Sequence, residues 1–81
     1  MKVTFSDRFT RSFIEAPERV QREFGKQLGH LLRNSRHPSL QAKKYSRQQD
    51  LWQARVELGW RFYFTIEEDG YHIHDIIPHP K

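Results

Sequence analysis

Apolar and polar residues alternate most regularly in the second half of the chain. The run LWQARVEL at 51–58 has this alternation, and so does WRFYFTIE at 60–67, with a single glycine between them. A period of two is typical of strands that bury one face. The acidic-glycine sequence at 68–70 predicts a hairpin turn. A last strand is expected over 71–77, where the less regular alternation of YHIHDII allows a bulge or register change near Asp75.

The beginning of the chain combines one strand signal with a helical one. Alternation in KVTF predicts a short strand over 2–5. Ser6 then suits the N-cap of a helix, with an acidic residue in the first turn. Phe9 and Phe13 lie four residues apart, so this helix presents both rings on one face. A first helix is therefore expected from Ser6 to the break at Ala16.

A second helix is predicted from Pro17 to about Asn34, because proline suits the first helical position. Gly25 and Gly29 lie beside its apolar stripe, where they either admit a close neighbour or weaken the helix. Residues 36–50, RHPSLQAKKYSRQQD, are interpreted as a polar connection. The stripe recurs at i, i+4, i+8, i+11 and i+12 and is expected in the core: Val20, Phe24, Leu28, Leu31 and Leu32.

This order of elements, β-α-α-β-β-β, predicts an α+β fold. Three consecutive strands joined by short turns form an antiparallel meander, and the first strand reaches this sheet only through the two helices. The helices must cover one face of the sheet to bury their aromatic and aliphatic side chains. The length of 81 residues fits a single domain over 1–81.

Composition excludes several classes of protein. The chain has no cysteine, which excludes disulfides, thiolate metal sites and cysteine nucleophiles. It shows neither a signal peptide nor an apolar run of the roughly 20 residues that cross a bilayer, and no glycine-rich phosphate loop. We expect a cytoplasmic protein without a membrane partner. The net charge of +4 is uneven, because residues 36–61 carry 6 basic and 2 acidic side chains whereas residues 62–81 carry 1 and 4.

The basic segment lies where the predicted sheet has an uncovered face. The parity that buries the apolar residues of 51–67 exposes Arg55, Arg61 and Tyr63 together. Cations that hold phosphates and rings that stack on unpaired bases would suit RNA. Exposed Arg and Tyr are also common on paired strands for solubility and edge protection, so parity alone leaves both interpretations open. Further candidates flank these strands: Lys43, Lys44 and Tyr45 before them and His79 after them.

The sequence HPSLQAKKY at 37–45, followed by LWQARVELGWRFYFTIEEDGYHIHDIIPH at 51–79, resembles the RelE/ParE toxin superfamily of bacterial type II toxin–antitoxin modules. The shared pattern is a His-Pro-Ser-Leu start, a lysine-rich link, Leu-Trp-x-Ala-Arg-Val, an aromatic-Arg-Phe-x-Phe strand, an acidic-Gly turn and a closing strand that ends in histidine. Each piece is a weak motif, but their order and spacing together are fairly specific. The resemblance covers nearly the whole chain and implies the RelE-like fold.

In the RelE-like branch, the resemblance implies endonucleolytic cleavage of mRNA without a metal or other cofactor, with dependence on the ribosome left open. Arg55, Arg61 and His79 are the expected catalytic residues: His79 as acid or base, and the arginines as ligands of the phosphate. The expected RNA-binding residues are Lys43, Lys44, Tyr45 and Tyr63. The expected partners are mRNA and an antitoxin protein.

Other interpretations remain open at this point. A ParE-like protein would inhibit DNA gyrase without cleaving RNA, and a degraded relative would only bind. His72 and His74 lie on one side of a strand and, with His79, suggest a metal site less strongly than ordinary exposed side chains. His37 is interpreted as a turn residue, and His30 as a surface residue.

Overall fold

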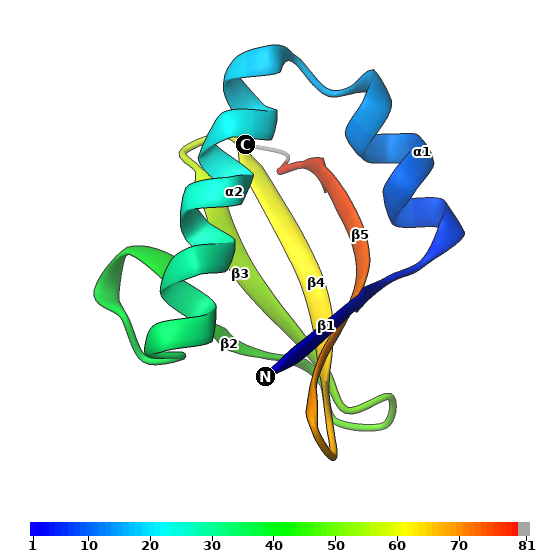
Figure 1. Cartoon of the computed structure of the whole chain (residues 1–81), viewed down its shortest axis with the longest axis vertical. Helices are drawn as coiled ribbons and strands as arrows, with labels where there is room; N and C mark the ends of the chain where they lie inside the picture. Colours follow the sequence, from blue (N-terminus) through cyan, green and yellow to red (C-terminus); the bar gives the residue numbers. More distant parts are fainter. Residues whose placement is uncertain (80–81) are drawn as a thin grey trace.

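In the computed structural model, which describes residues 1–79, five strands form one sheet in the order β1-β5-β4-β3-β2 (Figure 1). β1 pairs with β5 in parallel, and every other pair is antiparallel. Both helices lie on one side of this sheet. The predicted α+β fold is therefore confirmed, with one strand more than expected. The elements are β1 (Lys2–Phe5), α1 (Asp7–Glu15), α2 (Glu18–Arg33), the 3-10 helix η1 (Pro38–Leu40), β2 (Lys43–Ser46), β3 (Leu51–Glu57), β4 (Trp60–Glu67) and β5 (Gly70–Pro78).

The additional strand, β2, lies in the segment 36–50 that the sequence predicts as a polar connection, and that part of the prediction was wrong. Its four residues, KKYS, carry no apolar alternation. The strand exists because β3 offers a free edge, to which Lys43 and Lys44 pair opposite Gln53 and Trp52. Pairing with a neighbouring strand thus overrides the weak local preference.

α1 begins where the sequence predicts. The Ser6 hydroxyl accepts a hydrogen bond from the Phe9 N–H at 2.9 Å, as an N-cap does. The same hydroxyl donates to the His74 carbonyl at 2.6 Å, and the Ser6 N–H donates to the Ile73 carbonyl at 3.0 Å. Ser6 thus both starts the helix and fastens it to β5.

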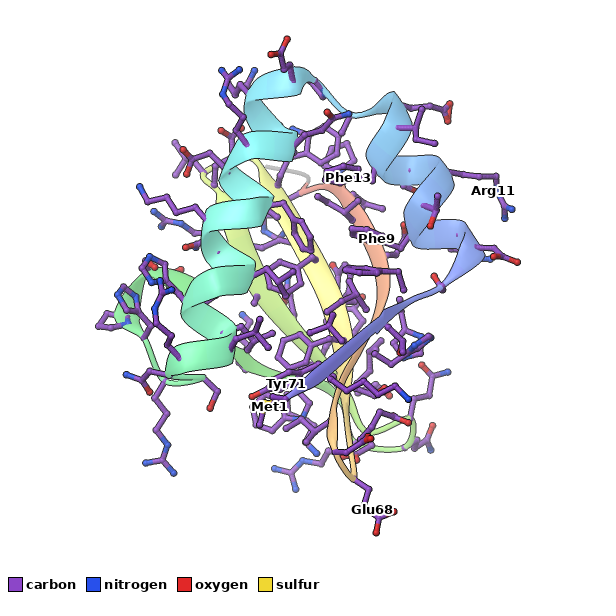
Figure 2. The ribbon with its side chains drawn as sticks, viewed as in Figure 1. Met1, Phe9, Arg11, Phe13, Glu68 and Tyr71 are labelled. Carbon is purple, nitrogen blue, oxygen red and sulfur yellow. The ribbon has the colours of Figure 1, made fainter. Side chains whose placement is uncertain are left out.

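Aromatic rings form the centre of the core between the helices and the sheet. Phe9 contacts Phe24 with ring centroids 5.0 Å apart, and Phe24 meets Phe62 edge-on at 5.1 Å. Figure 2 shows Phe9 and Phe13 pointing from α1 toward α2, whereas Arg11 points away from the core. The predicted α2 stripe is buried at Val20, Phe24 and Leu31 and partly buried at Leu28. Leu32, however, is 38% exposed and the polar Gln27 is buried.

A β-bulge interrupts β5. Tyr63 of β4 pairs with Asp75 and Phe64 pairs with Ile73, so His74 has no partner in the register. The bulge predicted near Asp75 is therefore present, one residue earlier. Because of it, Ile73 and Ile76 are both buried although they are three residues apart. Over residues 1–79, no helix has the length and apolar character required to cross a membrane.

Candidate active site

The side of the sheet opposite α1 and α2, called here the open face, contains a hollow of about 590 Å³. This open-face hollow lies between the start of α1, the β2–β3 connection and the strands β4 and β5. Both apolar and hydrogen-bonding side chains line it, which is typical of ligand sites of this size. The lining residues are Ser6, Arg8, Tyr45, Gln49, Leu51, Tyr63, Thr65, His74, Asp75 and Ile77.

Two of the predicted RNA-binding residues meet in this hollow. Tyr45 lies at an irregularity in the β2–β3 register and is 60% exposed. Its ring meets that of Tyr63 at 5.0 Å and 69°. Burial raises the pKa of the Tyr63 phenol, and the neighbouring Tyr45 raises it further, although the charge of Arg61 opposes the shift. This phenol is therefore protonated and able to donate at neutral pH. The pair therefore offers stacking surface beside a hydrogen-bond donor.

The predicted arginines lie opposite one another toward one end of the open face. Arg55 of β3 and Arg61 of β4 are cross-strand partners. The Arg61 guanidinium donates from Nη1 to the carbonyls of Glu57 and Trp60, both at 2.9 Å, and so holds the β3–β4 turn. The Arg55 carbonyl accepts from Gln27 at 2.8 Å. Arg61 thus has a structural role as well as a position suited to an anion.

His79 joins this end of the sheet. Its N–H donates to the Gly59 carbonyl at 2.8 Å, and its side chain is exposed. The pairing of β4 with β5 brings it there, because Arg61 pairs with Ile77 and Trp60 pairs with Pro78. The fold therefore brings the three predicted catalytic residues, Arg55, Arg61 and His79, to the same end of three adjacent strands.

The two predicted lysines lie on opposite sides of β2. Lys43 pairs with Gln53, which itself pairs with Tyr63, so Lys43 lies on the open face. Lys44 pairs with Trp52 on the helix side, where its ammonium lies 5.1 Å from the Trp52 ring centroid and forms an ion pair with Asp50. The structure therefore does not bring Lys44 to the open face, because neighbouring residues of a strand point in opposite directions.

The histidines of β5 have local partners. Nδ1 of His72 lies 2.6 Å from the Thr4 hydroxyl, and Nε2 of His74 lies 3.0 Å from the Thr65 hydroxyl. Burial lowers the pKa of His74, and the nearby His72 lowers it further. Within residues 1–79, no three His, Asp or Glu side chains gather as a metal site would require.

The other two histidines stack on each other beside α2. The rings of His30 and His37 are 3.8 Å apart at their centroids. The Ser39 N–H donates to Nδ1 of His37 at 3.2 Å, which agrees with the predicted turn role of His37. Burial, followed by the nearby His37 and basic side chains, lowers the pKa of His30.

The sequence pattern did not assign His74 and Asp75 to the site. Both line the open-face hollow although they are consecutive, because the bulge re-aims one of them. The irregular alternation of YHIHDII was the available signal, but it does not say which side chains turn toward the open face. Ser6 and Arg8 line the hollow because α1 packs against β5, and strand parity alone does not predict this packing.

Comparison with known proteins places this geometry in a fold family. The YoeB/ParE toxin from Agrobacterium tumefaciens has a TM-score of 0.81 at 12% identity, over 99% of this chain and 100% of that one. The YoeB dimer from Staphylococcus aureus matches at 0.81 with 15% identity, over 99% and 98%. The archaeal RelE–RelB complex from Pyrococcus horikoshii OT3 matches at 0.79 with 15% identity, over 99% and 96%. No family model and no curated protein matches the sequence. The chain therefore has the fold of the RelE/ParE toxin superfamily, as the sequence resemblance predicted.

Proposed function

We propose that this protein is the toxin of a bacterial type II toxin–antitoxin module and that it inhibits translation by cleaving mRNA in the cytoplasm. One observation carries the proposal: Arg55, Arg61 and His79 lie at the same end of three adjacent strands, and the open face of the same sheet holds the Tyr45–Tyr63 pair. Cations, a titratable imidazole and aromatic rings on one surface suit the binding and cleavage of a single-stranded RNA backbone.

The proposed reaction is an attack of a ribose 2′-hydroxyl on the adjacent phosphorus. A bond forms between O2′ and phosphorus, and the bond between phosphorus and the 5′-oxygen of the next nucleotide breaks. The 2′-hydroxyl gives up its proton, and the leaving oxygen takes one. The products are a 2′,3′-cyclic phosphate and a 5′-hydroxyl, and no redox partner is needed.

The side chains at this end of the sheet match those requirements. An imidazole can both accept and donate a proton, so His79 is assigned one of the two proton transfers. The exposed position of His79 leaves its ring accessible to an RNA strand. Arg55 is assigned to the charge that develops on the phosphorane, because a guanidinium can contact two phosphate oxygens at once. Arg61 contributes charge beside it and keeps the β3–β4 turn in place.

The proposed protein partner is an antitoxin. Solved structures of this fold include the RelB–RelE complex from Methanococcus jannaschii, YoeB–YefM from Staphylococcus aureus and DinJ–YafQ from E. coli. On the helix side of this chain, a second hollow of about 460 Å³ is lined by Trp52, Phe64 and Ile66 and bordered by Arg36. Ile66 is 51% exposed there. We assign this hollow to an amphipathic, acidic antitoxin segment, whose apolar residues would cover the rings while its carboxylates pair with the basic border.

The function is tested by induced expression in a bacterium, with growth followed and cuts in a reporter mRNA mapped by primer extension. Wild type is compared with Arg55→Ala and His79→Ala, and Arg47→Ala, on the exposed β2–β3 connection, is the control. The proposal predicts arrest with new cuts in wild type and control, and neither effect in the two site variants. Arg61→Ala is less informative because it also releases the turn.

Two results would overturn the nuclease assignment. Growth arrest without mRNA cuts would indicate a ParE-like target such as gyrase. Neither arrest nor cuts, with normal amounts of folded protein, would leave a protein that only binds. Because expression of each variant is confirmed by immunoblot, a lost effect is assigned to the site and not to a missing protein.

A further inference from the structure

The open-face hollow holds one feature that phosphate binding does not explain. Among residues 1–79, Asp75 is the only carboxylate that lines it. A negative side chain on a surface suited to RNA repels phosphate, so its presence there indicates a different contact. The β5 bulge is what turns Asp75 and His74 toward the same hollow, and such bulges commonly re-aim a side chain beside a functional site.

The position of Asp75 is fixed from two sides. Its Oδ1 accepts a hydrogen bond from the Ile76 N–H at 2.8 Å, which orients the carboxylate. Ser6 fastens the bulge through its bond to the His74 carbonyl at 2.6 Å. An ionised carboxylate has about four lone-pair sites, so one backbone bond leaves acceptor capacity for a ligand.

The remainder of the hollow suits a flat aromatic ligand. Tyr45 is 60% exposed, so a large part of its ring surface is accessible. Leu51 and Ile77 add apolar walls. Arg8, at the start of α1, places a cation on the border of the same hollow. Stacking surface, a fixed acceptor and a nearby cation together match the base and phosphate of one nucleotide.

The identity of the base follows from the acceptor. A carboxylate accepts but does not donate, and among the four RNA bases only guanine presents two adjacent donors, N1–H and N2–H₂, on its Watson–Crick edge. Adenine and cytosine present one donor beside an acceptor, and uracil presents one donor between two acceptors. We propose that the open-face hollow binds an unpaired guanine, with Asp75 accepting from its Watson–Crick edge and Tyr45 stacking on its ring.

This inference rests on the proposed function for its biological setting, but its chemistry can be measured without any cleavage. Mononucleotides are titrated into the ¹⁵N-labelled full chain, and backbone amide shifts are followed by NMR. GMP is compared with IMP, which lacks the 2-amino group, and with AMP. The expected order of affinity is GMP, then IMP, then AMP, with shifts around Tyr45, Tyr63 and the β5 bulge.

Asp75→Asn is the diagnostic variant. Asparagine retains an oxygen for the Ile76 N–H but loses the charge and replaces one acceptor with a donor. A charge-assisted contact of this kind is worth about tenfold or more in affinity for GMP. Glu68→Gln makes the same change of carboxylate to amide at the β4–β5 turn, where the side chain points away from the molecule (Figure 2). That control is expected to bind GMP like wild type.

The outcomes separate this inference from the proposed function. No saturable shift with GMP, equal binding of GMP and AMP, or a GMP preference that persists in Asp75→Asn would each overturn it. If the protein cleaves mRNA without preference for guanine near the cut, the nuclease assignment stands and this inference fails. If it binds GMP selectively and cleaves nothing, the reverse is true.

Discussion

The polar side chain at the centre of the helix–sheet packing is Gln27, and its replacement by leucine tests how the fold is held around the site. Gln27 is 5% exposed. Its Nε2 donates to the carbonyls of Ser39, at 3.1 Å, and Arg55, at 2.8 Å, and its Oε1 accepts from the Ser39 hydroxyl at 3.1 Å. One side chain thus joins α2, η1 and β3. Leucine has a similar size but can make none of these bonds.

The expected loss of stability follows from the three hydrogen bonds that leucine removes. Each net hydrogen bond contributes about 1 kcal/mol, so Gln27→Leu should lower the free energy of unfolding by about 3 kcal/mol. That is a large part of the roughly 4–12 kcal/mol expected for a domain of this size. It corresponds to a fall in melting temperature of roughly 12–24 °C.

Urea unfolding followed by tryptophan fluorescence measures this change, because Trp52 and Trp60 both pack against the core. Gln48→Leu, on the exposed β2–β3 connection, is the matched control and should change the free energy of unfolding by less than about 0.5 kcal/mol. If Gln27→Leu were as stable as this control, the reasoning that these hydrogen bonds join the helix to the sheet would be refuted.

Three further predictions concern the backbone, the cap and pH. A Cβ at Gly70 would lie 1.7 Å from a carbonyl oxygen of β1, so Gly70→Ala should lower the free energy of unfolding, measured in urea, by about 3 kcal/mol or more. Gly25 has nothing within 4 Å of an added Cβ, so Gly25→Ala should raise the free energy of unfolding by about 0.5–1 kcal/mol, and equal effects of the two variants would contradict this packing. Ser6→Ala removes the α1 cap and the bond to the β5 bulge, and should cost about 2 kcal/mol and weaken GMP binding; unchanged binding would show that the bulge does not need Ser6. The pKa values of His30 and His74 in the folded chain lie below the ordinary value of 6.5, chiefly through burial. As the pH drops below 6.5, the unfolded chain therefore binds protons at these histidines before the folded chain does, and the free energy of unfolding should fall. If the urea midpoint of the double variant His30→Gln/His74→Gln fell as much as that of wild type between pH 7.5 and 5.5, these two histidines would be excluded as the cause.

Local signals predicted much of the fold. Ser6 caps α1 because a serine hydroxyl can satisfy a free N–H within its own turn. The β3 and β4 alternation correctly placed Arg55, Arg61 and Tyr63 on the open face, because strand parity is a local property. The irregular alternation of the last strand marked the bulge to within one residue of Asp75. In each case the deciding interaction lies close in sequence to the signal.

What the sequence did not predict depends on partners far along the chain. β2 forms only because β3 offers an edge, and its pairing places Lys44 over Trp52 and away from the open face. Gln27 interrupts an apolar stripe and is buried because Ser39 and Arg55 supply partners from other elements. Asp75 lines the hollow because of a register shift against β4, which parity does not anticipate.

The most direct test of the nuclease assignment is the chemistry of the RNA ends. The purified chain is incubated with a defined mRNA that is either free or bound to ribosomes, and the free mRNA is also tested in excess EDTA. The termini of the cut RNA are identified by enzymatic end-labelling and mass spectrometry. Wild type is expected to produce 2′,3′-cyclic phosphate and 5′-hydroxyl ends, and His79→Ala is expected to produce none. Where free RNA is cut, EDTA should leave the cleavage unchanged. Ends carrying a 5′-phosphate, or no cleavage by a chain that still arrests growth, would contradict the nuclease assignment.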